Sequence, residues 1–254
     1  MNIENFRDVT LISLDDEKIL VVSCDSSGGI GEKEEDILKT SGDIVGYFTG
    51  KVAIAEILAL GAKPITIVDT LSVEMNNTGK NILKGVKKAL LEIGIDENIV
   101  VTGSTEENFH TVQTGIGVTV IGIIQKNLFR KTMAEDGAMI VLAGLPLVGQ
   151  DVLENPDKIV SLKDIVNLKE NHHVLEILPV GSKGILYEMK LMAEDRDLDF
   201  ILNKNIKVDL NQSAGPASCI LMAVKEEGMK YIEDNMNIPI NILGKFVGGE
   251  NDSN

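Results

Sequence analysis

The sequence predicts an α/β protein with two domains, and three observations support this. Apolar, β-branched segments alternate with longer segments that have apolar residues at helical spacing, as in folds that pack helices on a sheet. The chain has 254 residues, 44% of them hydrophobic, which is enough for two compact domains with their own cores. Basic residues gather in the segment 125–137, between two such blocks. We therefore expect domains at 1–125 and 126–254.

The first block begins with a strand and a helix. Residues 18–24 form an apolar run bounded by polar residues, which predicts a buried strand. Residues 45–62 carry apolar side chains on one helical stripe and predict a helix. After Lys63-Pro64 breaks that pattern, the β-branched segment 65–74 predicts a second strand. The other elements expected in this block are a helix at 78–94 and strands at 98–103 and 115–124.

The second block repeats this alternation of apolar runs and amphipathic segments. The elements that it predicts are strands at 138–144, 218–224 and 239–247, and helices near 161–169, 181–195 and 226–235. Each block is therefore expected to form an α/β or α+β unit.

The charge balance bears on the class of partner. The chain carries 39 acidic and 24 basic residues, a formal net charge of -15. Nucleic-acid-binding proteins normally present a basic surface to the phosphates, and anionic membrane surfaces attract basic segments. We therefore expect neither nucleic acid nor a membrane as a partner.

The cysteines and the first residues bear on the compartment. Cys24 and Cys219 are far apart in the sequence, and residues 1–8 are polar, unlike a signal peptide. No apolar run approaches the ~20 residues that span a bilayer. The sequence therefore predicts a cytoplasmic protein with reduced cysteines.

Residues 24–36, CDSSGGIGEKEED, contain three glycines and a lysine directly after the first predicted strand. Gly28, Gly29 and Gly31 would let backbone N–H groups approach a phosphate closely, and Lys33 would add a positive charge. The segment matches neither the P-loop, which needs adjacent Gly and Lys, nor the dinucleotide fingerprint. A phosphate-binding loop and a solvated surface turn are both compatible with this segment.

Several acids lie where a cation could bind. Asp25 follows the first predicted strand, and we expect it at the carboxyl end, where open α/β sheets bind ligands. Glu56 is the only charged residue in VAIAEILALGA, and Glu106 follows a predicted strand in TGSTEENF. Asp8 opens the apolar segment RDVTLI. Each acid has an ordinary alternative, which is a solvated helix face for Glu56 and a cap or turn for the other segments.

These candidate sites contain more acid than base, and a bare nucleotide would be repelled. Two like charges ~4 Å apart repel by roughly 4 kcal/mol at an effective dielectric constant of ~20. Mg²⁺ removes the repulsion by bridging carboxylates and phosphates, and hard oxygen ligands are the ones it prefers. Acids beside a glycine-rich loop therefore predict a site for a nucleotide with its metal.

Three segments of the first half share their order and spacing with a known family. They are VSCDSSGGIGEK, VGYFTGKVAIAEILALGAKPITIVDTLSVE and VVTGSTEENFHTVQTGIGVTVIG. They resemble the aminoimidazole-ribonucleotide-synthase-related (PurM-like) ATP-binding family, which includes that synthase, selenophosphate synthetase, thiamine-monophosphate kinase and the hydrogenase-maturation dehydratase. The second half matches more loosely, through PVGSKGILYEMKLMAED and GPASCILMAV.

The resemblance implies an N-terminal domain that binds ATP and Mg²⁺ and dimerises through its sheet into a β-barrel core, followed by a C-terminal α/β substrate domain. ATP would lie in a groove at the homodimer interface. The carboxylates that the resemblance assigns to the metal are Asp8, Asp25, Glu56 and Glu106. The nucleotide-binding residues that it implies are Gly28, Gly29, Gly31, Lys33, Thr102, Gly103, Ser104 and Thr105, and the catalytic ones are Asp25 and Lys33.

Two segments depart from the family pattern. Many relatives have Gly-Gly-Asp-Thr where this chain has Gly103-Ser104-Thr105-Glu106, so a metal ligand there moves to Glu106 or is lost. The family's Asp-Gly-Gly before a helix of the second domain is Ser182-Lys183-Gly184 here. This second departure suggests a different acceptor.

Within the family, the segments RDVTLI, CDSSGGIGEK and TGSTEEN are most similar to the short α-ribazole kinases of cobamide lower-ligand salvage. The resemblance thus implies a kinase that uses Mg²⁺ and ATP to phosphorylate a small hydroxylated acceptor. Two alternatives stay open: an ATP-dependent dehydratase or cyclo-ligase, and a non-catalytic nucleotide-binding module that regulates a partner.

Overall fold

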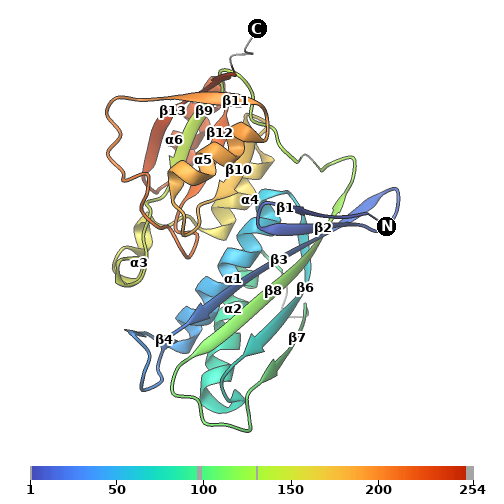
Figure 1. The fold of residues 1–254 in the computed structure, drawn as a ribbon, viewed down its shortest axis with the longest axis vertical. Helices are drawn as coiled ribbons and strands as arrows, with labels where there is room; N and C mark the ends of the chain where they lie inside the picture. The colour runs from blue at the N-terminus through green and yellow to red at the C-terminus, as the bar shows by residue number, and fades with distance from the viewer. Residues whose placement is uncertain (1, 96–98, 130, 250–254) are drawn as a thin grey trace. The chain divides into compact units, whose positions relative to one another are not determined.

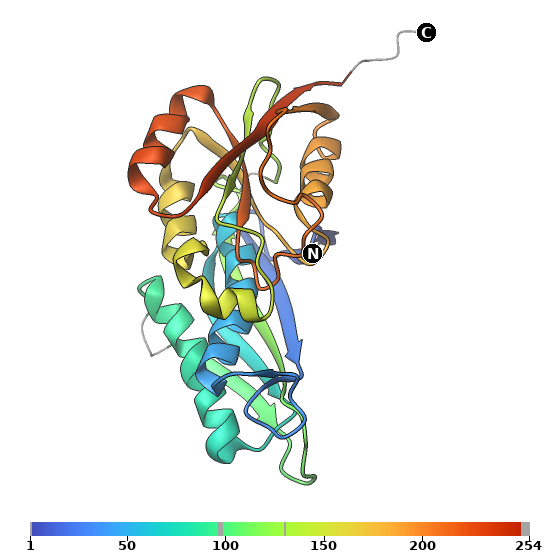
Figure 2. The same ribbon diagram turned by 90° about the vertical axis from the view of Figure 1, so that its left-hand side faces the viewer.

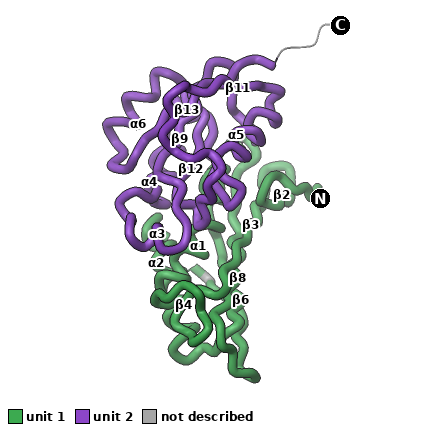
Figure 3. The backbone as a smooth tube through the Cα atoms, turned by 60° about the vertical axis from the view of Figure 1, so that its left-hand side comes forward, with its two compact units in different colours: residues 1–129 green, residues 130–254 purple. Residues whose placement is uncertain are grey.

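The computed structural model describes residues 2–95, 99–129 and 131–249. The chain divides into two compact units, Met1–Phe129 and Arg130–Asn254 (Figure 3). Each unit has its own sheet, and we describe each by itself.

Unit 1 is built on a six-stranded mixed sheet (Figure 1). The strand order is β1-β2-β3-β8-β6-β7, and only β6 and β7 pair in parallel. The strands are β1 (Ile3–Phe6), β2 (Val9–Ser13), β3 (Lys18–Gly28), β6 (Lys63–Leu71), β7 (Val100–Thr105) and β8 (Gly115–Gln125). Two short parallel strands, β4 (Ile30–Gly31) and β5 (Leu38–Lys39), lie apart from this sheet.

Two helices, α1 (Gly42–Ala59) and α2 (Lys80–Glu92), lie on one side of this sheet, as Figure 2 shows. Strand β8 alternates between buried and half-buried residues along its length, as expected when one face packs on helices and the other does not. The helices approach each other closely at glycines. A Cβ built at Gly85 would lie 1.9 Å from the backbone oxygen of Asp43.

The structure corrects one expectation about this unit and leaves another as a proposal. Strand β3 continues to Gly28, so Asp25 lies within the strand and pairs with Val118 of β8. The predicted end at residue 24 relied on the change from apolar to polar side chains, but ladder hydrogen bonds are made by the backbone. The sheet of the single chain is also open, with β1 and β7 at its edges, so the barrel remains a proposal about a dimer.

Unit 2 is built on an antiparallel five-stranded sheet of order β10-β12-β9-β13-β11. All five residues of β12 are buried, because helices cover both faces of this sheet (Figure 2). The core beside α5 includes Ile185 and Met189 of the helix and Phe246 of β13. The strands are β9 (Met139–Ala143), β10 (Val174–Pro179), β11 (Leu198–Leu202), β12 (Ile220–Val224) and β13 (Ile240–Gly248). The helices are α3 (Gln150–Glu154), α4 (Leu162–Glu170), α5 (Ile185–Glu194) and α6 (Met229–Asn235).

Together the units form a mixed α/β structure, as the sequence predicts. Among the described residues, none of the helices is both long and apolar enough to cross a bilayer. Cys24 and Cys219 are both free thiols.

Candidate functional site

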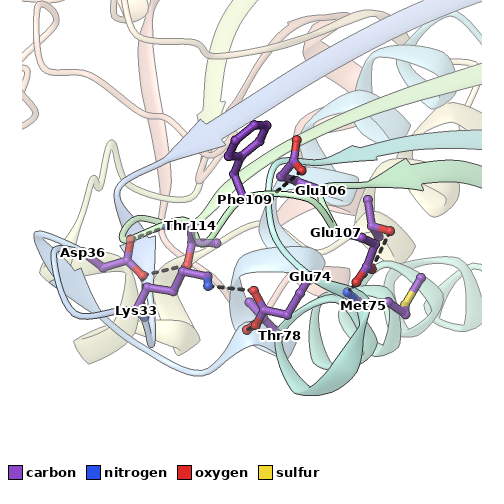
Figure 4. A network of polar contacts seen from close by, with 10 residues as sticks. Lys33, Asp36, Glu74, Met75, Thr78, Glu106, Glu107, Phe109 and Thr114 are labelled. Carbon is purple, nitrogen blue, oxygen red and sulfur yellow. Dashed lines mark hydrogen bonds and ion pairs between the residues drawn. The ribbon is translucent and has the colours of Figure 1, made fainter.

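The predicted site residues gather mainly along one edge of the sheet of unit 1. Strands β3 and β6 both pair antiparallel with β8, and β7 is parallel to β6. The carboxyl ends of β3, β6 and β7 therefore meet at the edge where β8 begins. The glycine-rich loop follows β3, and the acidic segments follow β6 and β7 (Figure 4).

The glycine-rich loop is held in a defined conformation. Gly29 and Gly31 have positive φ angles of 71° and 150°, and a Cβ at Gly31 would lie 2.4 Å from Thr114 Oγ1. Glycine is required at both positions, because side chains resist these angles. The Gly29 N–H donates to the Thr114 carbonyl at 2.9 Å, so this amide is already used within the protein. Gly28 has open space where a Cβ would lie.

The buried carboxylate of Asp36 fixes this loop from within. Asp36 is only 4% exposed. It accepts hydrogen bonds from the backbone N–H of Lys33 at 2.9 Å and from the N–H and hydroxyl of Thr114 at 2.8 and 2.7 Å (Figure 4). The loop between β3 and β5 is thereby tied to the residues that precede β8. These hydrogen bonds give the segment a defined conformation.

Lys33 does not point to free solvent. Its Nζ lies 2.7 Å from Glu74 Oε2, and the lysine side chain is only 10% exposed. The hydroxyl of Thr78 also donates to Glu74. Burial of the Glu74 carboxyl raises its pKa, but the hydrogen bonds from Lys33 and Thr78 outweigh burial and lower the pKa to about 2. A phosphate that binds Lys33 must therefore compete with an ionised carboxylate.

Two aspartates lie in one row across the sheet. Asp25 of β3 and Asp69 of β6 both pair with Val118 of β8. Residues in one row point to the same face, and two strand spacings separate them by about 10 Å. Burial raises the pKa of Asp25 to about 6 and raises the pKa of Asp69 as well. No cationic side chain is among the causes of either shift.

One of the predicted nucleotide residues of β7, Gly103, continues this row. Gly103 pairs with Asp69, and Thr105 pairs with Leu71. A Cβ at Gly103 would lie 2.4 Å from the Asp69 carboxylate, so only glycine leaves room for that carboxylate. Thr102 and Ser104 are exposed on the same strand.

The acids that follow β7 are engaged in the local turn. One oxygen of Glu106 accepts the N–H groups of Asn108 at 2.6 Å and Phe109 at 3.1 Å. Glu107 accepts the N–H of Met75 and the hydroxyl of Thr105. Glu106 therefore caps this turn, which is the ordinary alternative for the segment. Both hydrogen bonds go to the same oxygen, so the second oxygen is left for a cation.

Asp8 and Glu56 have different relations to Asp25. Asp8 is exposed in the two-residue turn between β1 and β2. Because Val9 pairs with Ser23, this turn continues toward the level of Asp25. Glu56 precedes Ile57, which contacts Gly122, and Gly122 is four residues along β8 from Val118. Four strand residues span about 13 Å, so Ile57, the neighbour of Glu56 on α1, packs on the sheet some distance from the row of Asp25.

The arrangement of these carboxylates limits the kind of magnesium site they can form. Among the described residues, no group of three or more acidic, histidine or cysteine side chains could hold a metal ion. A Mg²⁺ that accompanies a nucleotide needs only one or two carboxylates, since phosphates and waters complete its shell. The desolvated Asp25 carboxylate, with no cation to offset its burial, fits that role.

Three acids of this edge were missed by the sequence reasoning. Asp69 is the only charged residue in ITIVDTLSV, and Glu74 follows directly after that segment. An isolated acid in a β-branched segment was therefore the signal that could have indicated these site residues. Asp36 lay within the acidic run after Lys33, where burial of one member had no sequence signal.

In unit 2, the departing segment Ser182-Lys183-Gly184 precedes α5. Gly184 has a φ of 83° at the start of this helix. Lys183 Nζ donates to the Tyr187 hydroxyl at 3.0 Å and lies 4.2 Å from the ring centroid.

Comparisons with known proteins agree with this architecture. Residues 6–124 match the family described as "AIR synthase related protein, N-terminal domain". This match confirms the predicted resemblance for the N-terminal region. The comparison with curated proteins found no match.

Solved structures share the fold of the chain. Thiamine-monophosphate kinase from Stenotrophomonas maltophilia K279a superposes with a TM-score of 0.65 at 14% identity, over 97% of this chain and 89% of that one. Hydrogenase maturation protein HypE in complex with ATP has a TM-score of 0.66 at 13% identity, over 90% and 77%. T. maritima PurL complexed with ADP has a TM-score of 0.63 at 14% identity, over 96% of this chain but 42% of its own length.

Proposed function

We propose that the chain is a phosphotransferase that uses Mg²⁺ and ATP to phosphorylate a small hydroxylated acceptor. One observation carries the proposal. The glycine-rich loop and a desolvated carboxylate, Asp25, lie toward the end of the sheet where strands β3, β6 and β7 finish. Other proteins use this fold to bind ATP. The N-terminal family match supports the same assignment.

In this proposal Asp25 holds Mg²⁺, and Glu106 and Asp8 are further candidate ligands. The bound Mg²⁺ would neutralise charge on the phosphates. Asp25 suits this role because its carboxylate is partly withdrawn from water and lacks a cationic partner among the described residues. Glu56 of α1, whose neighbour Ile57 packs against Gly122 of β8, is proposed as a metal ligand or as a group that acts on the metal through water.

Lys33 and the glycines have separate roles. Gly28 offers an unobstructed backbone surface to a phosphate, while Gly29 and Gly31 set the path of the loop. Lys33 would exchange Glu74 for the phosphate, because both carry the negative charge that the ammonium group prefers. Thr102, Gly103, Ser104 and Thr105 would contact the nucleotide from β7.

The finer assignment is an α-ribazole kinase that acts as a cytoplasmic homodimer. It rests on the sequence resemblance of RDVTLI, CDSSGGIGEK and TGSTEEN. Phosphoryl transfer suits such a site because positioning and charge neutralisation supply most of its catalysis.

An ATP-dependent dehydratase or ligase is the second candidate. HypE and the thiamine-monophosphate kinase have TM-scores of 0.66 and 0.65. The likeness in fold therefore does not distinguish a kinase from another ATP-dependent enzyme. The third candidate, a regulatory nucleotide-binding module, stays open because the segment Ser182-Lys183-Gly184 departs from the family pattern.

The test is to incubate the purified protein with Mg²⁺, ATP and a panel of ribonucleosides that includes α-ribazole, and to follow phosphorus by NMR. We expect a new phosphomonoester signal and ADP, which both disappear on chelation of Mg²⁺ and in Asp25→Asn. Free phosphate without a phosphomonoester would favour a hydrolytic or ligase reaction. Nucleotide binding without turnover would leave only the regulatory module.

A further inference from the structure

A pocket of about 240 Å³ lies in unit 1 between β6, β7 and helix α2. Gly103, Ser104 and Thr105, three of the four β7 residues proposed to contact the nucleotide, line it, so the two substrates would share this strand, and the pocket extends to α2. Its volume is below the roughly 300–1,000 Å³ of pockets that enclose a whole drug-sized ligand. The pocket therefore suits one part of a small molecule.

The buried polar side chain of this pocket is the carboxylate of Asp69, whereas the other polar residues of its lining, Lys87, Ser104 and Thr105, are exposed or half-buried. Asp69 is only 3% exposed and lines the pocket. Burial raises its pKa, its own backbone N–H donates a hydrogen bond that lowers the pKa, and no side chain of the described residues is among the causes of the shift. Buried polar groups are normally hydrogen-bonded, so this carboxylate is suited to a ligand that donates one.

Gly103 keeps the carboxylate accessible to the pocket. It faces Asp69 on the neighbouring strand, and a Cβ at this position would lie 2.4 Å from Asp69 Oδ1. The missing side chain thus creates the space beside the carboxylate. A residue with any side chain would have to displace Asp69 or the backbone.

The remaining walls define the other half of the ligand. Met75, Leu83 and Val101 provide apolar surface, and Lys87 of α2 and Thr105 of β7 add polar groups. A ligand that fits has a hydrogen-bond-donating hydroxyl next to a less polar ring. A ribosyl group attached to a base has this chemistry.

We propose that this pocket binds the hydroxyl-bearing ribosyl end of the acceptor, with Asp69 accepting the hydrogen bond of the hydroxyl. The proposal rests on the proposed function and names the site of its second substrate. Asp69 lies in the same row as Asp25, on either side of Val118. The acceptor and the phosphates would therefore meet at the same sheet edge.

The experiment measures the binding of three probes separately by calorimetry: adenosine or α-ribazole without ATP, Mg²⁺ with ATP, and Mg²⁺ alone. The variants are Asp69→Asn, which preserves shape, and Leu83→Phe, which fills the pocket from α2. Glu17→Gln removes one exposed charge of the same unit and is the matched control. Circular dichroism melting verifies that each variant folds.

We expect the parent and the control to bind a nucleoside without ATP, and both pocket variants to lose at least tenfold in nucleoside affinity. Their affinity for ATP with Mg²⁺ should change less than twofold. Unchanged nucleoside binding in both variants would overturn the proposal. An equal loss of ATP binding, or binding of Mg²⁺ alone that depends on Asp69, would also overturn it and make the pocket a nucleotide or metal site. If the parent fails to bind ATP but Asp69 is needed for the nucleoside, the proposed function fails and the pocket stands.

Discussion

At the scale of single residues, Asp25 carries a burial penalty that its proposed metal would remove. Its pKa is raised from 3.8 to about 6 by desolvation. Between these values the folded state binds more protons than the unfolded state, so stability falls as pH rises through this window. Above pH 6 the full penalty is present. Such a penalty is typical of sites where function opposes stability.

We therefore predict that Asp25→Asn stabilises the ligand-free protein at pH 7.5 while it weakens the binding of ATP with Mg²⁺. The pKa shift sets an upper limit of about 3 kcal/mol, which partial solvent access reduces to about 1–2 kcal/mol. Urea unfolding at pH 4 and pH 7.5 measures the effect, and the gain should be smaller at pH 4. A destabilised variant at pH 7.5 would show that the Asp25 carboxylate makes favourable contacts instead.

The glycines of the loop are not equivalent, although the sequence makes them look alike. Gly29 has a φ of 71° and ordinary van der Waals contacts around the position of a Cβ, whereas Gly28 has open space and no positive φ. A substitution at Gly29 is strained by its backbone whether or not a ligand binds.

We predict that Gly28→Ala melts like the parent but binds ATP with Mg²⁺ at least several-fold more weakly, because its methyl group occupies the space of the phosphate. Gly29→Ala should lose about 1 kcal/mol of stability from the left-handed conformation alone. Thermal melting with and without nucleotide separates the two effects. Normal binding by Gly28→Ala would reduce the loop to a structural turn.

At the scale of elements, glycines also determine how α1 and α2 pack. A Cβ at Gly85 would lie 1.9 Å from the backbone oxygen of Asp43, while a Cβ at Gly50 would lie 3.6 Å from Val86. Both glycines are in helices of unit 1. The close approach of the helices needs a glycine at Gly85 but not at Gly50.

The two positions give a matched pair of opposite sign. Gly85→Ala should destabilise unit 1 by about 1–3 kcal/mol, since the helices must move apart. Gly50→Ala should stabilise it by up to about 1 kcal/mol, because alanine is the better helix former. Chemical denaturation of both variants provides the measurement, and equal effects would contradict the packing of α1 on α2.

The sequence was informative about long elements that are largely apolar, such as α1, or amphipathic, such as α2, and less so elsewhere. The helices 45–62 and 78–94 correspond to α1 and α2, and the strand 115–124 corresponds to β8. Strands β1, β2, β10 and β11 were missed, as were the two-residue strands β4 and β5. The exposed β11, with its burial pattern of mainly exposed and half-buried residues, has little alternation from which a strand could be predicted. Lys33 was singled out, but its partner Glu74 lies 41 residues away, and such a contact depends on the tertiary fold.

At the scale of the whole molecule, the sheet of unit 1 has two different faces. Ile67, Val118 and Val120 are apolar, but they are buried on the face that packs on α1. The opposite face of the sheet, which does not pack on α1, carries the half-buried Val22 and Ile121 in neighbouring strands.

This second face is the proposed surface for a homodimer. Thr66 is level with Ile121 in the adjacent strand, and Ile65, where the register of β6 shifts, is 44% exposed. An apolar sheet face of several strands is normally covered in soluble proteins. Two copies that pack these faces together would cover both and complete the barrel-like core that the family resemblance implies.

We predict that the protein is a dimer at micromolar concentration and that Ile121→Glu converts it to a monomer, because the interface would bury an unpaired charge. Leu91→Glu is the control, since Leu91 is 49% exposed on α2, away from this face. Light scattering should give twice the chain mass for the parent and the control. A monomeric parent would contradict the dimer, and a dimeric Ile121→Glu variant would place its interface elsewhere. If ATP lies at this interface as the resemblance implies, the monomeric variant should also lose nucleotide affinity, whereas the control should keep it.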